Sequence, residues 1–235
     1  MLCVYVDMVL KVHNGYKNAR TFFTSDNATN YDSIVRFSTF GQDYLWKNQI
    51  VKMTGKKGLV LDLACGTGIL SSMFIDNADI TRVIGLDLEF NYLKIAKNKR
   101  KNFLLINGTA EMLPYKNECF DSIVSSYLAK YVDVKIVVDE CWRTLKHDGT
   151  VLFHDFTYPT HKLLQSFWNM YFVILRITGY ATKPWLTVFN ELDELVKNSE
   201  WVERTIASLK QRGFKNVFCK YYTFGTAAII FARKP

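Results

Sequence analysis

Gly58-Leu59-Val60-Leu61-Asp62-Leu63-Ala64-Cys65-Gly66-Thr67-Gly68-Ile69-Leu70 is the part of the sequence from which the fold follows. It begins as an apolar run with a single acid, which is typical of a strand buried on both faces. Two glycines then interrupt the run, and helix-compatible residues resume at Ile69. The pattern predicts a strand, a tight turn and a helix. Glycines in such a turn let the backbone approach a ligand, and the helix start offers unpaired N–H groups.

The next predicted strand ends in an acid. Asp87 closes the run 82–87 and lies about 20 residues after Gly68, where a doubly wound fold places the carboxylate that holds a ribose. The lysine of a phosphate-binding P-loop is missing, because Ile69 and Leu70 follow Gly68. Together these features favour a nucleoside ligand such as S-adenosylmethionine or a dinucleotide over ATP.

Strand and helix patterns alternate through the middle of the chain. We expect strands at 59–64, 82–87, 103–107, 120–125 and 150–156 and helices at 69–77, 91–101 and 133–146. Alternation of this kind predicts an α/β fold with a parallel sheet and helices on both faces. The ending, 217–233, has the pattern of two strands around Gly225.

Composition indicates one globular protein with a sizeable core. The chain has 235 residues, 49% of them hydrophobic and 15% aromatic, which excludes a disordered chain. The net charge of +8 suits an anionic partner, although solubility explains it equally well. The cysteines are odd in number and form no C-x-x-C pair, so we expect reduced thiols and no metal site. They are Cys3, Cys65, Cys119, Cys141 and Cys219.

The chain divides into a helical N-terminal segment or lid, 1–55, and a nucleotide-binding domain, 56–235, which together form effectively one domain. Residues 1–10 are apolar but lack a basic start, so they make a poor signal peptide. An aromatic-rich helical insertion spans about 157–210. Such a segment suits a cap over an apolar substrate or simply additional core, and both readings stay open. We expect a cytoplasmic protein, with peripheral contact to a membrane left open.

Several motifs resemble the class I S-adenosylmethionine-dependent methyltransferases. Asp62 to Gly68 is similar to that family's first motif, an acid and small residues before G-T-G. Residues 107–115 resemble its G-D/N-A-E-x-L-P-F loop, 120–124 its fourth strand, and 145–152 its L-K-P-G-G-x-L turn. The resemblance implies a Rossmann-like doubly wound seven-stranded sheet whose last strand is antiparallel, with S-adenosylmethionine as the cofactor.

A longer resemblance, from about residue 20 to the end, is to the C-methyltransferases of ubiquinone and menaquinone biosynthesis. Residues 31–47 resemble their Y-D-x-x-N-x-x-x-S-F-G-x-x-x-x-W-R/K segment, with Val35 where the family has Asn. Residues 154–159 resemble E-F-S-K-P, and Gly213-Phe214 matches an A-G-F turn. The resemblance implies carbon methylation of an apolar quinone precursor such as demethylmenaquinone.

The same resemblance implies which residues hold the cofactor. Asp62, Gly66 and Gly68 correspond to the methionine end, and Asp87 corresponds to the ribose. Thr109, in place of the usual Asp or Asn, and Ala110 correspond to the adenine edge. The full expected set is Asp62, Ala64, Gly66, Thr67, Gly68, Asp87, Leu88, Thr109, Ala110 and Ser125.

For catalysis the quinone family uses a tyrosine and an Arg-Asn pair to orient a water that takes the ring proton. Tyr31 matches the tyrosine, and Lys130-Tyr131 aligns with the pair, so the cation survives but the amide does not. These three residues are the expected catalytic set. His154, at the end of a strand, could be a base or a structural histidine.

Other functions remain open beside quinone methylation. Residues 188–195 stand where the quinone family has an S-Y-R-Y-L-x-x-S segment, and they lack its hydroxyls. Altered pocket motifs of this kind favour O- or N-methylation of another small molecule as an alternative. A non-catalytic cofactor-binding partner subunit is a further one. Nucleic-acid methylation is not expected, because the chain contains neither a D/N-P-P-F/Y loop nor a P-C nucleophile. The expected partner is an apolar small-molecule acceptor, and the chain is expected to be a monomer or homodimer.

Overall fold

The structure is a computed structural model that describes residue 19 and residues 22–55, 58–76 and 82–235. The strands are β1 Leu59–Leu63, β2 Arg82–Asp87, β3 Leu104–Asn107, β4 Phe120–Ser126, β5 Leu145–Phe156, β6 Lys215–Tyr222 and β7 Ala227–Arg233. The helices are α2 Ser25–Ala28, α3 Tyr31–Ser38, α4 Gln42–Thr54, α5 Ile69–Asp76, α6 Phe90–Lys99, α7 Val134–Thr144, α8 Lys162–Ala181, α9 Leu186–Asn198 and α10 Trp201–Arg212, with short 3₁₀ turns η1 Lys183–Trp185 and η2 Thr223–Gly225.

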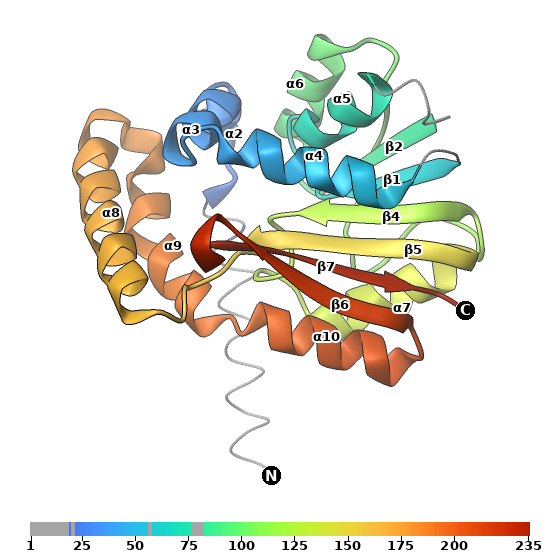
Figure 1. Cartoon of the computed structure of the whole chain (residues 1–235). Coiled ribbons are helices and arrows are strands. Elements are labelled where there is room, and N and C mark those ends of the chain that lie inside the picture. Colours follow the sequence, from blue (N-terminus) through green and yellow to red (C-terminus); the bar gives the residue numbers. More distant parts are fainter. Residues whose placement is uncertain (1–18, 20–21, 56–57, 77–81) are drawn as a thin grey trace, which may run out of the picture.

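The strands form one seven-stranded sheet in the order β3-β2-β1-β4-β5-β7-β6 (Figure 1). β1 pairs in parallel with β2 and β4, and the outer pairs β2–β3 and β4–β5 are parallel too. β7, the last strand of the chain, is antiparallel to both β5 and β6. This confirms the predicted doubly wound sheet with an antiparallel last strand.

Helices cover both faces of the sheet. α4 and α5 bury Ile50, Leu70 and Phe74 on one face, against Val60 and Val124 of the central strands. α7 and α10 pack together on the other face (Figure 1). The central strands are thus apolar on both sides, as their near-continuous hydrophobic sequences predict.

α8 and α9 pack against each other beyond one end of the sheet and form a helical cap (Figure 1). The expected insertion, 157–210, also contains α10. That helix lies on α7 and β6 and not in the cap. We therefore use the word cap for α8, η1 and α9 alone.

The boundary after α7 differs from the prediction of a helix over 133–146. The helix ends at Thr144, and β5 begins at Leu145, which pairs with Phe120 of β4 before a bulge. The extended chain brings the Lys146 ammonium within 2.9 Å of both carboxylate oxygens of Asp121. Tertiary pairing therefore overrides the local helical pattern at this end.

The described part of the N-terminal segment is helical, as expected, and α4 lies directly on β4 and β5. No helix within the described ranges is long and apolar enough to cross a membrane. Cys65, Cys119, Cys141 and Cys219 are free thiols, and the first and third of them are buried. Cys3 and the expectation for residues 1–10 lie outside the described residues.

Candidate functional site

The two glycines of the turn after β1 adopt the left-handed conformation that glycine favours, and Ala64 adopts it as well. Ala64, Gly66 and Gly68 have φ values of 57°, 55° and 78°, in the left-handed region. A Cβ on Gly68 would lie 2.7 Å from a ring carbon of Phe103, so this glycine allows the turn to pack against the segment before β3. A Cβ on Gly66 would meet only the Tyr92 ring, at 3.7 Å. Gly66 therefore faces a more open space than Gly68.

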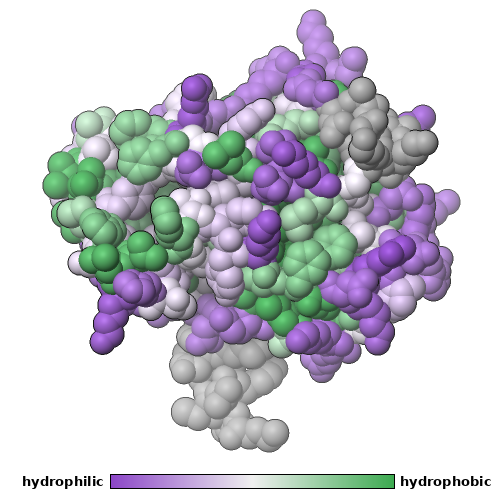
Figure 2. Space-filling model, in the orientation of Figure 1, coloured by the Kyte–Doolittle hydropathy of each residue, from purple (hydrophilic) through white to green (hydrophobic). Residues whose placement is uncertain are grey.

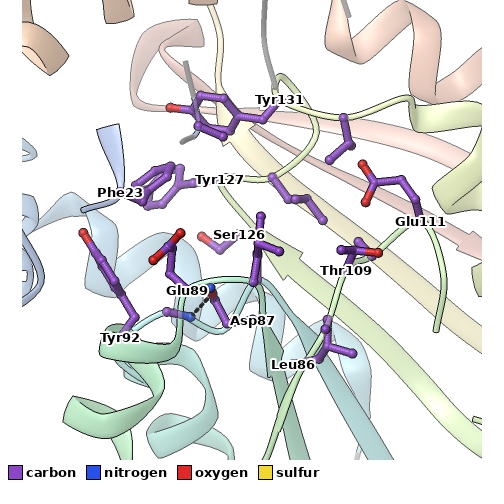
Figure 3. Close-up of a pocket in the computed structure, with 18 of the residues that line it drawn as sticks. Phe23, Leu86, Asp87, Glu89, Tyr92, Thr109, Glu111, Ser126, Tyr127 and Tyr131 are labelled. Atoms are coloured by element: carbon purple, nitrogen blue, oxygen red, sulfur yellow. Dashed lines mark hydrogen bonds between the residues drawn. The ribbon is translucent and has the colours of Figure 1, made fainter. Parts of the chain in front are cut away.

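Asp87 ends β2 beside this turn and accepts two backbone hydrogen bonds. The Gly66 N–H donates to Oδ2 at 2.7 Å, which is the dashed line at Asp87 in Figure 3. The Glu89 N–H donates to Oδ1 at 2.8 Å. Burial raises the pKa of Asp87 to about 6, although both backbone bonds oppose the shift. The carboxylate is therefore held in place and titrates not far below neutral pH.

A pocket lies at the carboxyl ends of β1, β2 and β4, where open α/β sheets bind ligands. Figure 3 shows Phe23, Tyr92 and Tyr131 on one side of it and Thr109 and Glu111 on the other. We call it the nucleoside pocket. Its lining includes Tyr31, Ala64, Gly66, Leu86, Asp87, Leu88, Glu89, Tyr92, Thr109, Ala110, Glu111, Ser126, Tyr127 and Tyr131.

Four of the expected cofactor residues lie behind this lining. The buried Asp62 carboxylate accepts a 2.6 Å hydrogen bond from the Ser71 hydroxyl, and burial raises its pKa to about 7. Thr67 donates to Asp32 at 2.5 Å, and Ser125 donates to the Leu63 carbonyl at 3.0 Å. Together with Gly68, these residues shape the turn and the strand ends. Direct contact between them and the cofactor stays a prediction.

Tyr92 and Ser126 line the nucleoside pocket, and the motifs did not identify them. The buried Tyr92 hydroxyl has no hydrogen-bond partner among the described residues, which suits a site that receives a polar ligand. Its position on the first turn of the helix after Asp87 was the available signal. Ser125 was the expected residue on this strand. Adjacent strand residues point to opposite faces, so this alternation was the signal for its neighbour Ser126.

A second and larger cavity lies between the sheet and the helical cap. Its volume is about 620 Å³, within the range of ligand sites, and we call it the acceptor cavity. Apolar side chains from α3, α8 and α9 form about half of its wall. Among the described residues that line it, Lys130 is the one charged residue.

The nucleoside pocket and the acceptor cavity share part of their walls. Phe23, Tyr31, Tyr127 and Tyr131 line both of them. The rings of Tyr31 and Tyr131 each contact Phe23, with centroids 6.3 and 5.5 Å apart. We call these four residues the aromatic wall. Electron-rich ring faces of this kind attract a cation such as a sulfonium.

Lys130 forms an ion pair with Asp155 at 2.5 Å, and both side chains are almost completely buried. Burial lowers the pKa of Lys130 and raises that of Asp155, and each charge opposes the shift of the other. The Lys130 ammonium also lies 4.5 Å from the centre of the Tyr131 ring. The expected catalytic residues Tyr31, Lys130 and Tyr131 are therefore brought together at the acceptor cavity. The sequence did not identify Asp155 as the partner of Lys130.

A second buried ion pair lies near the first, and the lysines of both pairs contact the Tyr127 ring. Lys47 pairs with Asp43, whose carboxylate also accepts a 2.7 Å hydrogen bond from the Tyr127 hydroxyl. His154 Nδ1 lies 2.9 Å from the Ser126 hydroxyl, and His154 lines neither cavity. Burial and the nearby lysines lower the pKa of His154 well below its ordinary value. The place of His154 outside both cavities favours a structural histidine over a base, and its role stays a prediction.

The chemical groups that line the nucleoside pocket suit S-adenosylmethionine. The pocket offers a carboxylate at the end of β2, a glycine backbone, aromatic faces and the buried Tyr92 hydroxyl, which has no partner in the described part of the chain. Its volume of about 110 Å³ is below that of ordinary ligand sites.

This sheet order, with a glycine turn and an acid at the ends of β1 and β2, defines a Rossmann-like fold of the methyltransferase type. An S-adenosylmethionine-dependent methyltransferase from Aquifex aeolicus shares the fold, with a TM-score of 0.61 and 14% identity over 91% of this chain and 100% of that one. The chain belongs to the ubiE/COQ5 methyltransferase family, whose profile matches residues 12–234. It is therefore an S-adenosylmethionine-dependent methyltransferase.

Two relatives are similar to the chain over most of both sequences. The demethylmenaquinone methyltransferase of Staphylococcus carnosus is 29% identical, over 93% of this chain and 91% of that protein. That of Lactococcus lactis is 30% identical, over 88% of this chain and 86% of that protein. The similarity thus includes the cap and the N-terminal helices as well as the nucleotide-binding sheet.

Proposed function

We propose that this protein transfers a methyl group from S-adenosylmethionine to a ring carbon of an apolar quinol, with demethylmenaquinol as the leading candidate. The observation that carries the proposal is the aromatic wall shared by the nucleoside pocket and the acceptor cavity. In-line methyl transfer needs a donor and an acceptor held close together in a dry site. The relatives named above support the choice of acceptor.

In the nucleoside pocket we assign Asp87 to the ribose hydroxyls and the loop of Thr109 and Ala110 to the adenine edge. Asn107 supports this assignment, because its side-chain amide donates to the carbonyls of Asp87 and Leu88 at 2.9 and 2.8 Å. That contact ties the loop after β3 to the end of β2. Gly66 and Tyr92 then face the methionine end, and Asp62 supports the turn through Ser71.

In the acceptor cavity we assign the ring to the region beside Lys130 and Tyr31. The bound cofactor supplies an electrophilic methyl group. The ring carbon would form a bond to this methyl as the methyl–sulfur bond breaks, which leaves S-adenosylhomocysteine, and the carbon would then lose its proton to a water. Lys130, held by Asp155, donates an N–H to a ring oxygen and favours negative charge there, which makes the ring carbon more nucleophilic. Tyr31 and Lys130 orient the water that takes the ring proton.

Methylation of an oxygen or nitrogen on another small molecule is the second candidate. Lys130 and Tyr131 stand where the quinone family has an Arg-Asn pair, and a lysine cannot hold two groups in the fixed geometry of a guanidinium. Val188, Phe189 and Leu192 also line the acceptor cavity, in a segment where the family carries hydroxyls. The pocket is thus more apolar than the family pattern.

Transfer of a labelled methyl group tests the proposal. Purified protein is given labelled S-adenosylmethionine and demethylmenaquinol, and the label is partitioned between organic solvent and water. We expect the label in the organic phase on the quinone. Label that stays in water while a cell lysate yields a polar methylated product would favour the second candidate. The oligomeric state, monomer or homodimer, is measured in the same preparation by sedimentation.

A further inference from the structure

The acceptor cavity opens to the surface through an apolar rim. Five side chains line the cavity and are also between 52% and 81% exposed. They come from the α3–α4 connection, from α8 and from η2. They are Phe40, Phe167, Met170, Ile174 and Phe224. Exposed aromatic and aliphatic residues that surround a cavity mouth indicate an interaction surface.

The rim continues along the outer face of α8. Leu163, Phe167, Met170, Ile174 and Ile177 follow one another at spacings of three or four residues, and all are exposed. The opposite face of the helix buries Trp168, Phe172 and Leu175 in the core. α8 is therefore apolar on both sides, whereas a surface helix of a water-soluble protein has one polar face.

Hydrophobic residues also gather around α8 on the visible surface. Val173 and Tyr180 add to the outer face of α8, and Phe37 is exposed on α3. Figure 2 shows hydrophobic side chains over this end of the molecule, where Figure 1 places the cap. We define the docking surface as the five rim residues together with Phe37, Leu163, Val173, Ile177 and Tyr180.

The charges near this surface are positive. The sequence has no acidic residue between Asp155 and Glu191, a stretch that contains Lys162, Arg176 and Lys183. Arg176 pairs with Asp193 of α9, so the two lysines carry the argument. Lys162 and Lys183 are exposed at the two ends of α8, and Arg36 is exposed on α3 beside Phe37. An apolar helix face framed by cations suits an anionic lipid surface. Glu191 and Glu194, the exposed acids of the cap, lie on α9 instead.

We propose that the docking surface lies on the surface of an anionic lipid bilayer, with α8 parallel to the membrane plane. The mouth of the acceptor cavity then faces the acyl chains, and a quinol reaches Lys130 without crossing water. This last step rests on the proposed function, whereas lipid binding itself does not. A second copy of the chain on the same surface would cover the mouth of the cavity, which favours a lipid occupant.

Vesicle co-sedimentation tests the proposal. The wild-type protein should bind vesicles that contain phosphatidylglycerol, more weakly at high salt and more weakly to neutral vesicles. The variant Val173→Glu/Ile177→Glu changes two docking-surface residues that do not line the acceptor cavity. Because it loses two apolar contacts and gains two negative charges, we expect its partitioning to fall about tenfold or more.

The matched control is Leu104→Glu/Ile136→Glu, which makes the same charge change at two exposed aliphatic residues on β3 and α7. It should bind vesicles like the wild type. Both double variants should methylate a short-chain acceptor in solution at the wild-type rate. If the wild type also fails to methylate the short-chain acceptor, the proposed function is contradicted, but the lipid-binding proposal is not.

Three results would overturn the docking proposal. The wild type could fail to bind anionic vesicles, or Val173→Glu/Ile177→Glu could bind as well as the wild type. The third result is a wild-type protein that is a dimer and does not bind vesicles, with a dimer that Val173→Glu/Ile177→Glu disrupts and the control variant does not. That outcome would make the surface an interface between two copies.

Discussion

Individual residues decide how the two cavities differ in chemistry. Asp87 gives the nucleoside pocket a carboxylate held by two backbone N–H groups. Lys130 gives the acceptor cavity its one charge among the lining residues described. The resemblance could place both residues because each lies in a recognisable motif. It could not supply Asp155 as the partner of Lys130, because that contact depends on how β5 packs against the loop after β4.

The buried ion pair should be essential to activity and costly to break. Lys130→Met or Asp155→Asn alone leaves one group buried without its partner, and we expect each to destabilise the protein by about 3 kcal/mol. The double variant should recover part of that loss, because no unpaired charge remains. Urea unfolding measures the stabilities. All three variants should lose most methyl-transfer activity. If both single variants are as stable as the wild type, the buried ion pair does not stabilise the fold as proposed.

Cofactor affinity should depend on pH through Asp87. In the proposed assignment its carboxylate accepts hydrogen bonds from the ribose hydroxyls, so binding favours the ionised form and lowers a pKa that burial raises to about 6 in the free protein. Affinity for S-adenosylmethionine should therefore fall as the pH drops below 6. Titration calorimetry at several pH values measures the effect. Asp87→Asn should bind more weakly at pH 7 and with a flatter profile, and an equal pH dependence in both proteins would contradict the assignment.

At the level of elements, the sequence predicts the strands and helices around the glycine turn better than it predicts the cap. The spacing of hydrophobic residues, glycines and acids predicted β1, α5 and β2 closely, because local conformation and burial agree there. The end of α7 was predicted two residues too long because β4 pairs with Leu145. The helical cap was anticipated only as an apolar insertion. Its division from α10 depends on contacts between distant segments.

Two alanine substitutions in the turn should have different effects. Gly68→Ala places a Cβ 2.7 Å from Phe103 at a positive φ, so we expect a loss of about 2 kcal/mol in unfolding free energy. Gly66→Ala meets no atom closer than 3.7 Å, so it should cost less stability but weaken cofactor binding. Thermal unfolding and a binding titration measure the two quantities. The reverse order of stabilities would contradict the packing role of Gly68.

The whole molecule places the nucleoside pocket and the acceptor cavity on either side of four aromatic side chains. The sequence could predict the sheet and the first pocket, because their motifs are short and local. It could not show that Phe23, Tyr31, Tyr127 and Tyr131 form one shared wall, because they come from separate parts of the chain. The docking surface was foreseen only as an open question of membrane contact, since α8 alone does not reveal which face is exposed.

The most direct test of the account is to identify the atom that receives the methyl group. Purified protein is incubated with demethylmenaquinol and S-adenosylmethionine that carries a ¹³C-labelled methyl, and the product is examined by NMR. The account predicts a methyl signal on a ring carbon of the quinone, absent with Lys130→Met. A methyl group on an oxygen, or a quinol left unmethylated by a protein that binds S-adenosylmethionine, would contradict it.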